Sequence, residues 1–130
     1  MTIEVQEPLI SEQRLWVNTL MQQVHKANEK WWIDLKTGEK KERNFGEAIA
    51  LIHSELSEAL EGNRKGLQDD HLPNYKSEEV ELADALIRIF DLAGGLDLNL
   101  GDAFAAKMIY NSMREDHKMK NRKLDGGKKY

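Results

Sequence analysis

The chain has 130 residues, of which 40% are hydrophobic and 32% charged, and its net charge is −4. This balance is typical of a soluble globular domain and too apolar for a disordered chain, and no apolar run approaches the roughly 18 residues of a membrane span. The absence of cysteine excludes disulfides and thiolate metal sites. We therefore expect one domain over residues 1–130 and a cytoplasmic location, without contact with a membrane.

The charge is unevenly distributed along the chain. Residues 107–130 contain eight Lys and Arg against three Asp and Glu, a local charge of +5, whereas the preceding residues carry −9. A basic C-terminal arm on an acidic body indicates either a solvated tail or an arm for an anionic partner such as nucleic acid.

The first predicted helix begins at Ser11, a candidate N-cap, and continues to Trp31 or Trp32. Residues 1–10 show no clear period, and we expect them and residues 121–130 to be flexible. The charged segment that follows the helix, with the sequence DLKTGEKKER, predicts a loop or a small hairpin.

The second predicted helix begins after Asn44, because Asn44 and Glu47 form a pattern like a capping box. It is expected to end near Glu61, since Gly62 can adopt the left-handed conformation of a helix terminator. A polar loop with two glycines and Pro73 follows.

The third predicted helix extends from Ser77 to Gly94–Gly95, and the fourth begins at Asn99 or Asp102 and continues to about Lys120. No segment shows the period of a strand over more than a few residues. Four helices joined by connections of moderate length predict an all-α fold, a four-helix bundle-like domain.

Two of these helices have an acidic stripe beside their apolar face. Glu55 and Glu58 lie at the border of the apolar face of the second helix, and Glu81 and Asp84 lie beside that of the third. Each stripe alone is more typical of an exposed helix surface. Within each pair the two residues are three apart on one helix, so their Cβ atoms lie about 5–6 Å from each other. If the two helices are antiparallel neighbours, the two pairs together could place four carboxylates in the groove between them.

Such a group of carboxylates can bind a hard cation. Mg²⁺ prefers oxygen ligands and also recruits phosphates, and Mn²⁺ is a possible substitute. No histidine stands where a di-iron bundle would have its Glu-x-x-His pair. Glu55, Glu58, Glu81 and Asp84 are therefore the candidate metal ligands, and Mg²⁺ is the expected cofactor.

The fourth helix has a basic stripe at helical spacing, opposite its apolar side. The stripe contains Lys107, Asn111, Arg114 and Lys118.

ELSE contains Glu55 and Glu58, and ELAD, after a spacer of 22 residues, contains Glu81 and Asp84. This pattern resembles the ExxE…ExxD signature of MazG-like nucleoside triphosphate pyrophosphohydrolases. This family belongs to the all-α NTP pyrophosphatase superfamily. Further likeness lies in ADALIRIFDLAG and KMIYNSMRED…GGKKY, so the resemblance covers about residues 45–130.

The resemblance implies hydrolysis of an NTP or dNTP to a nucleoside monophosphate and pyrophosphate, with Mg²⁺ on the four acidic residues. It also implies that Lys107, Arg114 and Lys128 contact phosphates and that Asn111 contacts the sugar or a phosphate. A carboxylate that is not fully used as a ligand could accept the proton of the attacking water. Glu58 is our candidate for this catalytic role, with Glu55 as the alternative.

Aromatic residues are the candidate partners of the base. Trp31, Trp32 and Tyr110 could stack on it, although tryptophans at the end of an amphipathic helix also pack in cores or dimer interfaces. Of the two tryptophans, Trp32 is the stronger candidate. We expect His25 and His53 to make structural hydrogen bonds rather than to bind metal.

The third helix is apolar over more than half its circumference, which together with the family resemblance suggests a homo-dimer or tetramer. One alternative is a non-catalytic helical module that binds a nucleotide or nucleic acid through the basic C-terminal arm; the acidic remainder makes nucleic acid unlikely. A regulatory nucleotide binder and a different Mg²⁺-dependent phosphohydrolase are two further alternatives.

Overall fold

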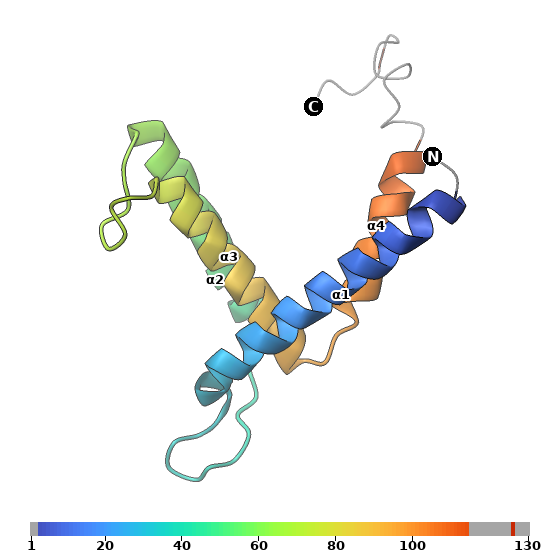
Figure 1. Cartoon of the computed structure of the whole chain (residues 1–130). Helices are drawn as coiled ribbons and strands as arrows, with labels where there is room; N and C mark the ends of the chain where they lie inside the picture. The colour runs from blue at the N-terminus through green and yellow to red at the C-terminus, as the bar shows by residue number, and fades with distance from the viewer. Residues whose placement is uncertain (1–2, 115–125, 127–130) are drawn as a thin grey trace. The chain divides into compact units, whose positions relative to one another are not determined.

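The computed structural model describes residues 3–114 and residue 126, with side chains from residue 11 onward. The regular elements in this part are helical (Figure 1) and confirm the all-α class. They are α1 (Ile3–Asn28), the 3-10 helix η1 (Glu29–Trp32), α2 (Phe45–Lys65), α3 (Ser77–Gly95) and α4 (Leu100–Met113). No helix in these described ranges is both long and apolar enough to span a membrane.

The chain divides into two compact units. One unit is Leu20–Leu98, and the described residues 3–19 and 99–114 belong to the other. Within the Leu20–Leu98 unit, α2 and α3 lie side by side (Figure 1), and this helical pair positions the acidic residues.

Helix α1 begins at Ile3, so the predicted start at Ser11 is wrong. The apolar spacing on which that prediction rested is clear only from Leu15 onward, so the sequence pattern missed the first turns. The predicted end near Trp32 agrees with η1.

The loop between η1 and α2 is a small hairpin, as predicted. The Asp34 amide donates to the Glu39 carbonyl at 2.8 Å, and Ile33 forms a β-bridge with Lys40. The Asp34 carboxylate accepts from the amides of Lys36 and Thr37, which closes the turn.

Helix α2 begins as predicted, because the Asn44 side chain accepts a hydrogen bond from the Glu47 amide at 2.9 Å. The predicted end near Glu61 is wrong, and α2 continues to Lys65. Gly62 instead allows α2 to approach α3, since a Cβ there would lie 2.3 Å from the Ser77 hydroxyl. The left-handed residue is Gly66, with φ +63°.

Helix α4 begins after Asn99, as predicted, but it ends at Met113. Arg114 has extended backbone angles, φ −66° and ψ 135°, which interrupt the helical hydrogen bonds. The predicted continuation to Lys120 is therefore wrong at Arg114. Residues 115–125 and 127–130, including the end that we expected to be flexible, lie outside the described residues.

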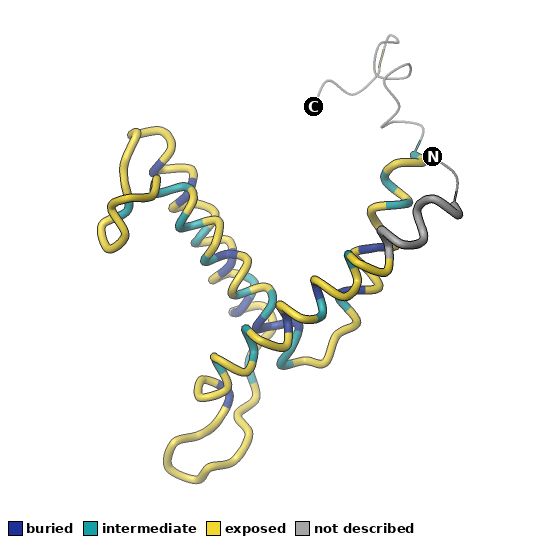
Figure 2. Tube along the Cα trace, in the orientation of Figure 1, coloured by how far each residue is buried: buried dark blue, intermediate teal, exposed yellow. Residues whose placement is uncertain are grey.

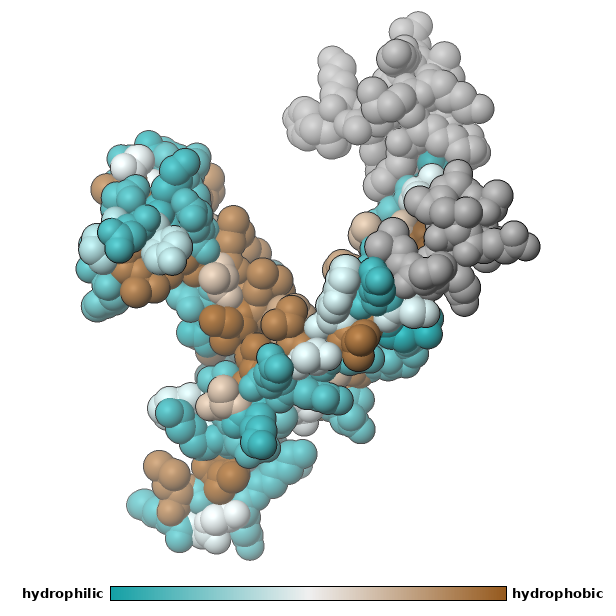
Figure 3. Space-filling model, viewed as in Figure 1, coloured by the Kyte–Doolittle hydropathy of each residue, from teal (hydrophilic) through white to brown (hydrophobic). Residues whose placement is uncertain are grey.

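The core of the Leu20–Leu98 unit is small. One cluster of buried side chains joins η1, α2 and α3: Trp32, Ala48, Ile52, Ala85 and Leu92. Figure 2 shows that the buried positions are short stretches of the trace and that most of it is exposed. Leu56, Leu60 and Leu86, which the helical period placed on the apolar faces, are 44%, 61% and 52% exposed. Apolar side chains accordingly gather on the surface of the α2–α3 pair (Figure 3).

In the other unit, α4 packs against the first part of α1. Arg14 Nε lies 2.6 Å from the Asp102 carboxylate, and the Asn18 side chain accepts from the Gly101 amide at 3.2 Å. Ala105 of α4 is fully buried.

Candidate metal centre and adjoining cavity

Three of the four predicted ligands come together between α2 and α3. Glu55 of α2 and Glu81 and Asp84 of α3 each offer an oxygen atom, and these atoms all lie within 4.8 Å of one another. Glu58, one turn after Glu55, lies within hydrogen-bond reach of Glu55 and Glu81, but its side chain is exposed. We call Glu55, Glu58, Glu81 and Asp84 the acidic cluster.

Glu81 has the most unusual environment in the acidic cluster. A hydrogen bond with Glu55, burial, and the repulsion of Glu58 raise the pKa of Glu81 from its usual 4.5 to about 8. Its buried Oε2 atom has no hydrogen-bond donor among the described residues. A shared proton, a cation or a water molecule would satisfy this oxygen.

Glu55 and Asp84 have pKa values shifted in opposite directions. Burial raises the pKa of Glu55, but hydrogen bonds from Glu81 and Arg88 outweigh burial and hold it below its usual range. The Arg88 Nε atom donates to Glu55 Oε1 at 2.9 Å. Burial and the nearby Glu55 charge raise the pKa of Asp84.

A cavity of about 600 Å³ adjoins the acidic cluster, and Glu55, Asp84 and Arg88 line it. This volume is within the range of small-molecule sites. The loop before α2 also contributes to the lining through Lys41 and Arg43, as does the exposed Trp31 of η1. The cavity therefore combines carboxylates, cationic side chains and an aromatic ring.

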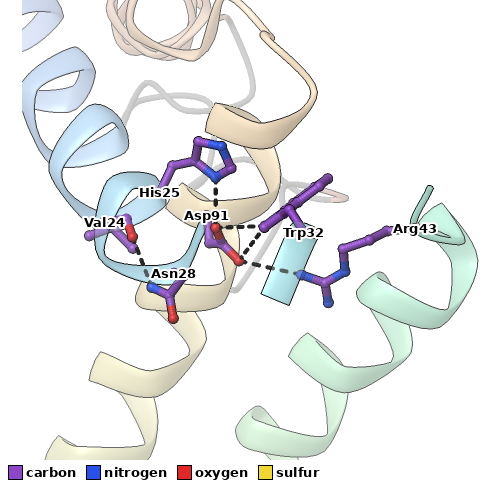
Figure 4. A network of polar contacts seen from close by, with 6 residues as sticks. All are labelled: Val24, His25, Asn28, Trp32, Arg43 and Asp91. Atoms are coloured by element: carbon purple, nitrogen blue, oxygen red, sulfur yellow. Dashed lines mark hydrogen bonds and ion pairs between the residues drawn. The ribbon is translucent and has the colours of Figure 1, made fainter. Parts of the chain in front are cut away.

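Asp91 of α3 lines this cavity and is the acceptor at the centre of a network of polar contacts (Figure 4). It is 7% exposed and accepts hydrogen bonds from His25 Nδ1 at 2.9 Å and from Trp32 Nε1 at 3.0 Å. Arg43 Nη1 reaches its other oxygen at 3.4 Å. Three donors satisfy this buried carboxylate, and the predicted structural hydrogen bond of His25 is confirmed.

The two tryptophans differ in exposure. Trp32, predicted to contact the nucleoside, is 4% exposed, and its ring packs against His25 and beneath Arg43, whose guanidinium carbon is 4.9 Å from the ring centre. Stacking of a base on Trp32 would require these contacts to open. Trp31 is 59% exposed and lines the cavity.

The predicted phosphate and nucleoside contacts of α4 lie in the other unit. Lys107 Nζ and the Arg114 guanidinium lie 4.6 Å and 5.7 Å from the centre of the Tyr110 ring. The Asn111 side-chain oxygen is buried and has no donor within the described part of the chain. Lys128 lies outside the described residues.

Sequence reasoning assigned no role to Arg43 or Arg88 in the cavity, and it ranked Trp31 below Trp32 as a partner of the base. Arg88 follows Asp84 by four residues and shares its helix face, so its position was available from the helical period. Arg43 precedes a helix in an irregular loop, where no period predicts the direction of a side chain.

The acidic cluster fits a hard divalent cation in its donor chemistry. It offers carboxylate oxygens alone, which Mg²⁺ and Mn²⁺ accept, and the buried Glu81 Oε2 lacks a donor among the described residues. Comparisons with protein families, with curated proteins and with solved structures found no match for this chain.

Proposed function

We propose that this protein is a Mg²⁺-dependent nucleoside triphosphate pyrophosphohydrolase, which converts an NTP or dNTP to the monophosphate and pyrophosphate. The observation that supports it best is the meeting of Glu55, Glu81 and Asp84 within 4.8 Å at the edge of a cavity of about 600 Å³. The resemblance of ELSE…ELAD to the MazG-like signature supplies the reaction type.

Glu55, Glu81 and Asp84 would hold the cation, with Mn²⁺ as a possible substitute. When bound, Mg²⁺ would neutralise negative charge on the phosphate oxygens and act as a Lewis acid. The distances among these three carboxylates support their role as ligands.

Glu58 would be the general base. Its side chain is exposed and borders the three ligands, so water can reach it. Glu58 would take a proton from the water that attacks the α-phosphorus, while the bond from that phosphorus to the bridging oxygen breaks and pyrophosphate leaves. Glu55, the alternative base, is engaged by Arg88, which favours Glu58.

The cavity offers partners for the rest of the substrate. Lys41, Arg43 and Arg88 would contact phosphate oxygens, and the exposed face of Trp31 would accept the base. Some further contacts are proposed from the sequence alone. They are phosphate contacts by Lys107, Arg114 and Lys128, and nucleoside contacts by Asn111, Trp32 and Tyr110.

A second copy of the chain would complete the bundle-like fold. Leu82, Leu86 and Ile89 follow one another at helical spacing on α3 and are 50%, 52% and 36% exposed. Apolar stripes of this kind are normally covered in folded proteins. A homo-dimer or tetramer, in the cytoplasm and away from membranes, is the form that we propose.

The test is a panel of NTPs and dNTPs with Mg²⁺, with the products resolved as monophosphate, pyrophosphate or phosphate. We expect monophosphate and pyrophosphate in equal amounts. Glu58→Gln should lower the rate at least about 100-fold, and Glu61→Gln, an exposed glutamate one turn away, is the matched control. Release of orthophosphate alone would contradict the proposal, and salt-sensitive binding of nucleic acid without hydrolysis would favour the alternative module.

A further inference from the structure

Arg88 directly contacts one of the proposed metal ligands. Its Nε atom donates to Glu55 Oε1 at 2.9 Å, and this carboxylate is one of the three proposed metal ligands. The Glu55 side chain is 12% exposed, whereas that of Arg88 is 40% exposed. The carboxylate is thus held in place between the helices, while the guanidinium lies at the boundary with solvent.

A guanidinium and a divalent cation would compete for this carboxylate. Both are attracted to the same negatively charged carboxylate group, and two positive charges a few ångströms apart repel each other. Glu55 lies within 4.8 Å of Glu81 and Asp84, so a cation shared by the three would take the position next to the guanidinium. The long, partly exposed Arg88 side chain can move, while the carboxylates on packed helices are constrained.

Arg88 also has a second partner within reach. It lines the cavity together with Arg43 and Lys41, where the proposed triphosphate would lie. A guanidinium released from Glu55 could make two parallel hydrogen bonds to a phosphate group.

We propose that Arg88 is an exchange residue: it occupies Glu55 when the acidic cluster is without metal, and it moves to a phosphate of the ligand when a divalent cation takes Glu55. This inference rests on the proposed metal site. It predicts opposite effects of one substitution on two ligands. Loss of Arg88 should strengthen the binding of metal alone and weaken the binding of the phosphate ligand.

The experiment is calorimetric titration of the chelator-treated full-length protein, first with Mg²⁺ and then, at saturating Mg²⁺, with pyrophosphate. We expect Arg88→Gln to bind Mg²⁺ about three- to tenfold more tightly, since one nearby positive charge is removed, and to bind pyrophosphate at least about tenfold more weakly. Urea unfolding checks that the variant is folded.

Two further variants separate charge from geometry. Arg88→Lys keeps the charge without the planar fork, so its Mg²⁺ affinity should stay near that of the wild type while pyrophosphate binding weakens. Arg64→Gln removes a cation from α2 that is 71% exposed and paired with Glu61, and it should change neither affinity by more than about twofold.

The outcomes distinguish the inference from the proposed function. If the wild type binds Mg²⁺ but Arg88→Gln binds it equally or more weakly, Arg88 orders Glu55 and the exchange is refuted. If Arg88→Gln binds Mg²⁺ more tightly but pyrophosphate unchanged, the transfer to phosphate is refuted. If the wild type binds no Mg²⁺, the proposed metal site fails as well.

Discussion

Replacement of Glu81 by Gln should stabilise the metal-free protein in alkaline solution. Its hydrogen bond with Glu55 and its burial raise the pKa of Glu81 from 4.5 to about 8. The unfolded chain therefore releases this proton near pH 4.5, whereas the folded protein keeps it until about pH 8. Between these values the folded state binds more protons, so the free energy of unfolding falls as the pH rises. Gln has the same shape and does not ionise.

The magnitude follows from this difference in pKa. At about 1.36 kcal/mol for each pK unit, the full shift would correspond to an upper limit of about 5 kcal/mol. Solvent reaches the edge of the acidic cluster through the exposed Glu58, and screening reduces the effect. We expect Glu81→Gln to exceed the wild type by about 1–2 kcal/mol in alkaline solution.

The assay is urea unfolding followed by far-ultraviolet circular dichroism, in chelator, at about pH 5 and about pH 8.5. The difference between wild type and variant cancels the contributions of the titrating groups that do not interact with Glu81. Glu79→Gln, on the exposed side of α3, is the control, and its difference from the wild type should be the same at both pH values. The reasoning is refuted if the Glu81→Gln difference does not grow with pH.

Addition of Mg²⁺ at the alkaline pH should reverse this order. The wild type should gain stability by binding the cation in the folded state, whereas the Glu81→Gln variant offers the proposed site one anionic ligand fewer. A variant that gains as much stability from Mg²⁺ as the wild type would remove Glu81 from the metal site.

The remaining predictions concern packing and assembly. Asp91→Asn should lower the free energy of unfolding by about 2–4 kcal/mol, because it weakens the acceptor of three buried or partly buried donors; Asp97→Asn, at a left-handed position that Asn tolerates, should change it little in the same urea assay. Gly95→Ala should cost about 1–3 kcal/mol in thermal unfolding, since its Cβ would lie 2.3 Å from the Trp32 ring. Leu86→Asp should give monomers in analytical ultracentrifugation if the exposed α3 stripe is the interface between copies, and an unchanged mass would contradict that interface.

Local sequence rules predicted several features of this chain. The Asn44–Glu47 pattern located the start of α2. The helical period placed Glu81 and Asp84 on one side of α3 and placed Glu55 at the border of the apolar face of α2. These features depend on residues within about one turn of each other. The geometry of the helix alone determines which of these residues are neighbours.

Other features depended on which segments meet. Gly62 and Gly66 are equally able to end a helix by sequence, and the packing of α2 on Ser77 decided between them. Trp31 and Trp32 are neighbours in the sequence, yet only Trp32 reaches the buried Asp91 carboxylate. No local rule distinguishes such pairs.

The sequence by itself therefore determined the all-α class, the start of α2 and the identity of the paired carboxylates. The tertiary structure decided that Glu55, Glu81 and Asp84 converge, that Arg88 engages Glu55, and that Arg43 and Trp31 line the same cavity. The physical reason is that helical periodicity specifies which side chains share a face. The contacts between faces depend instead on the path of the loops and on the small residues that let helices approach.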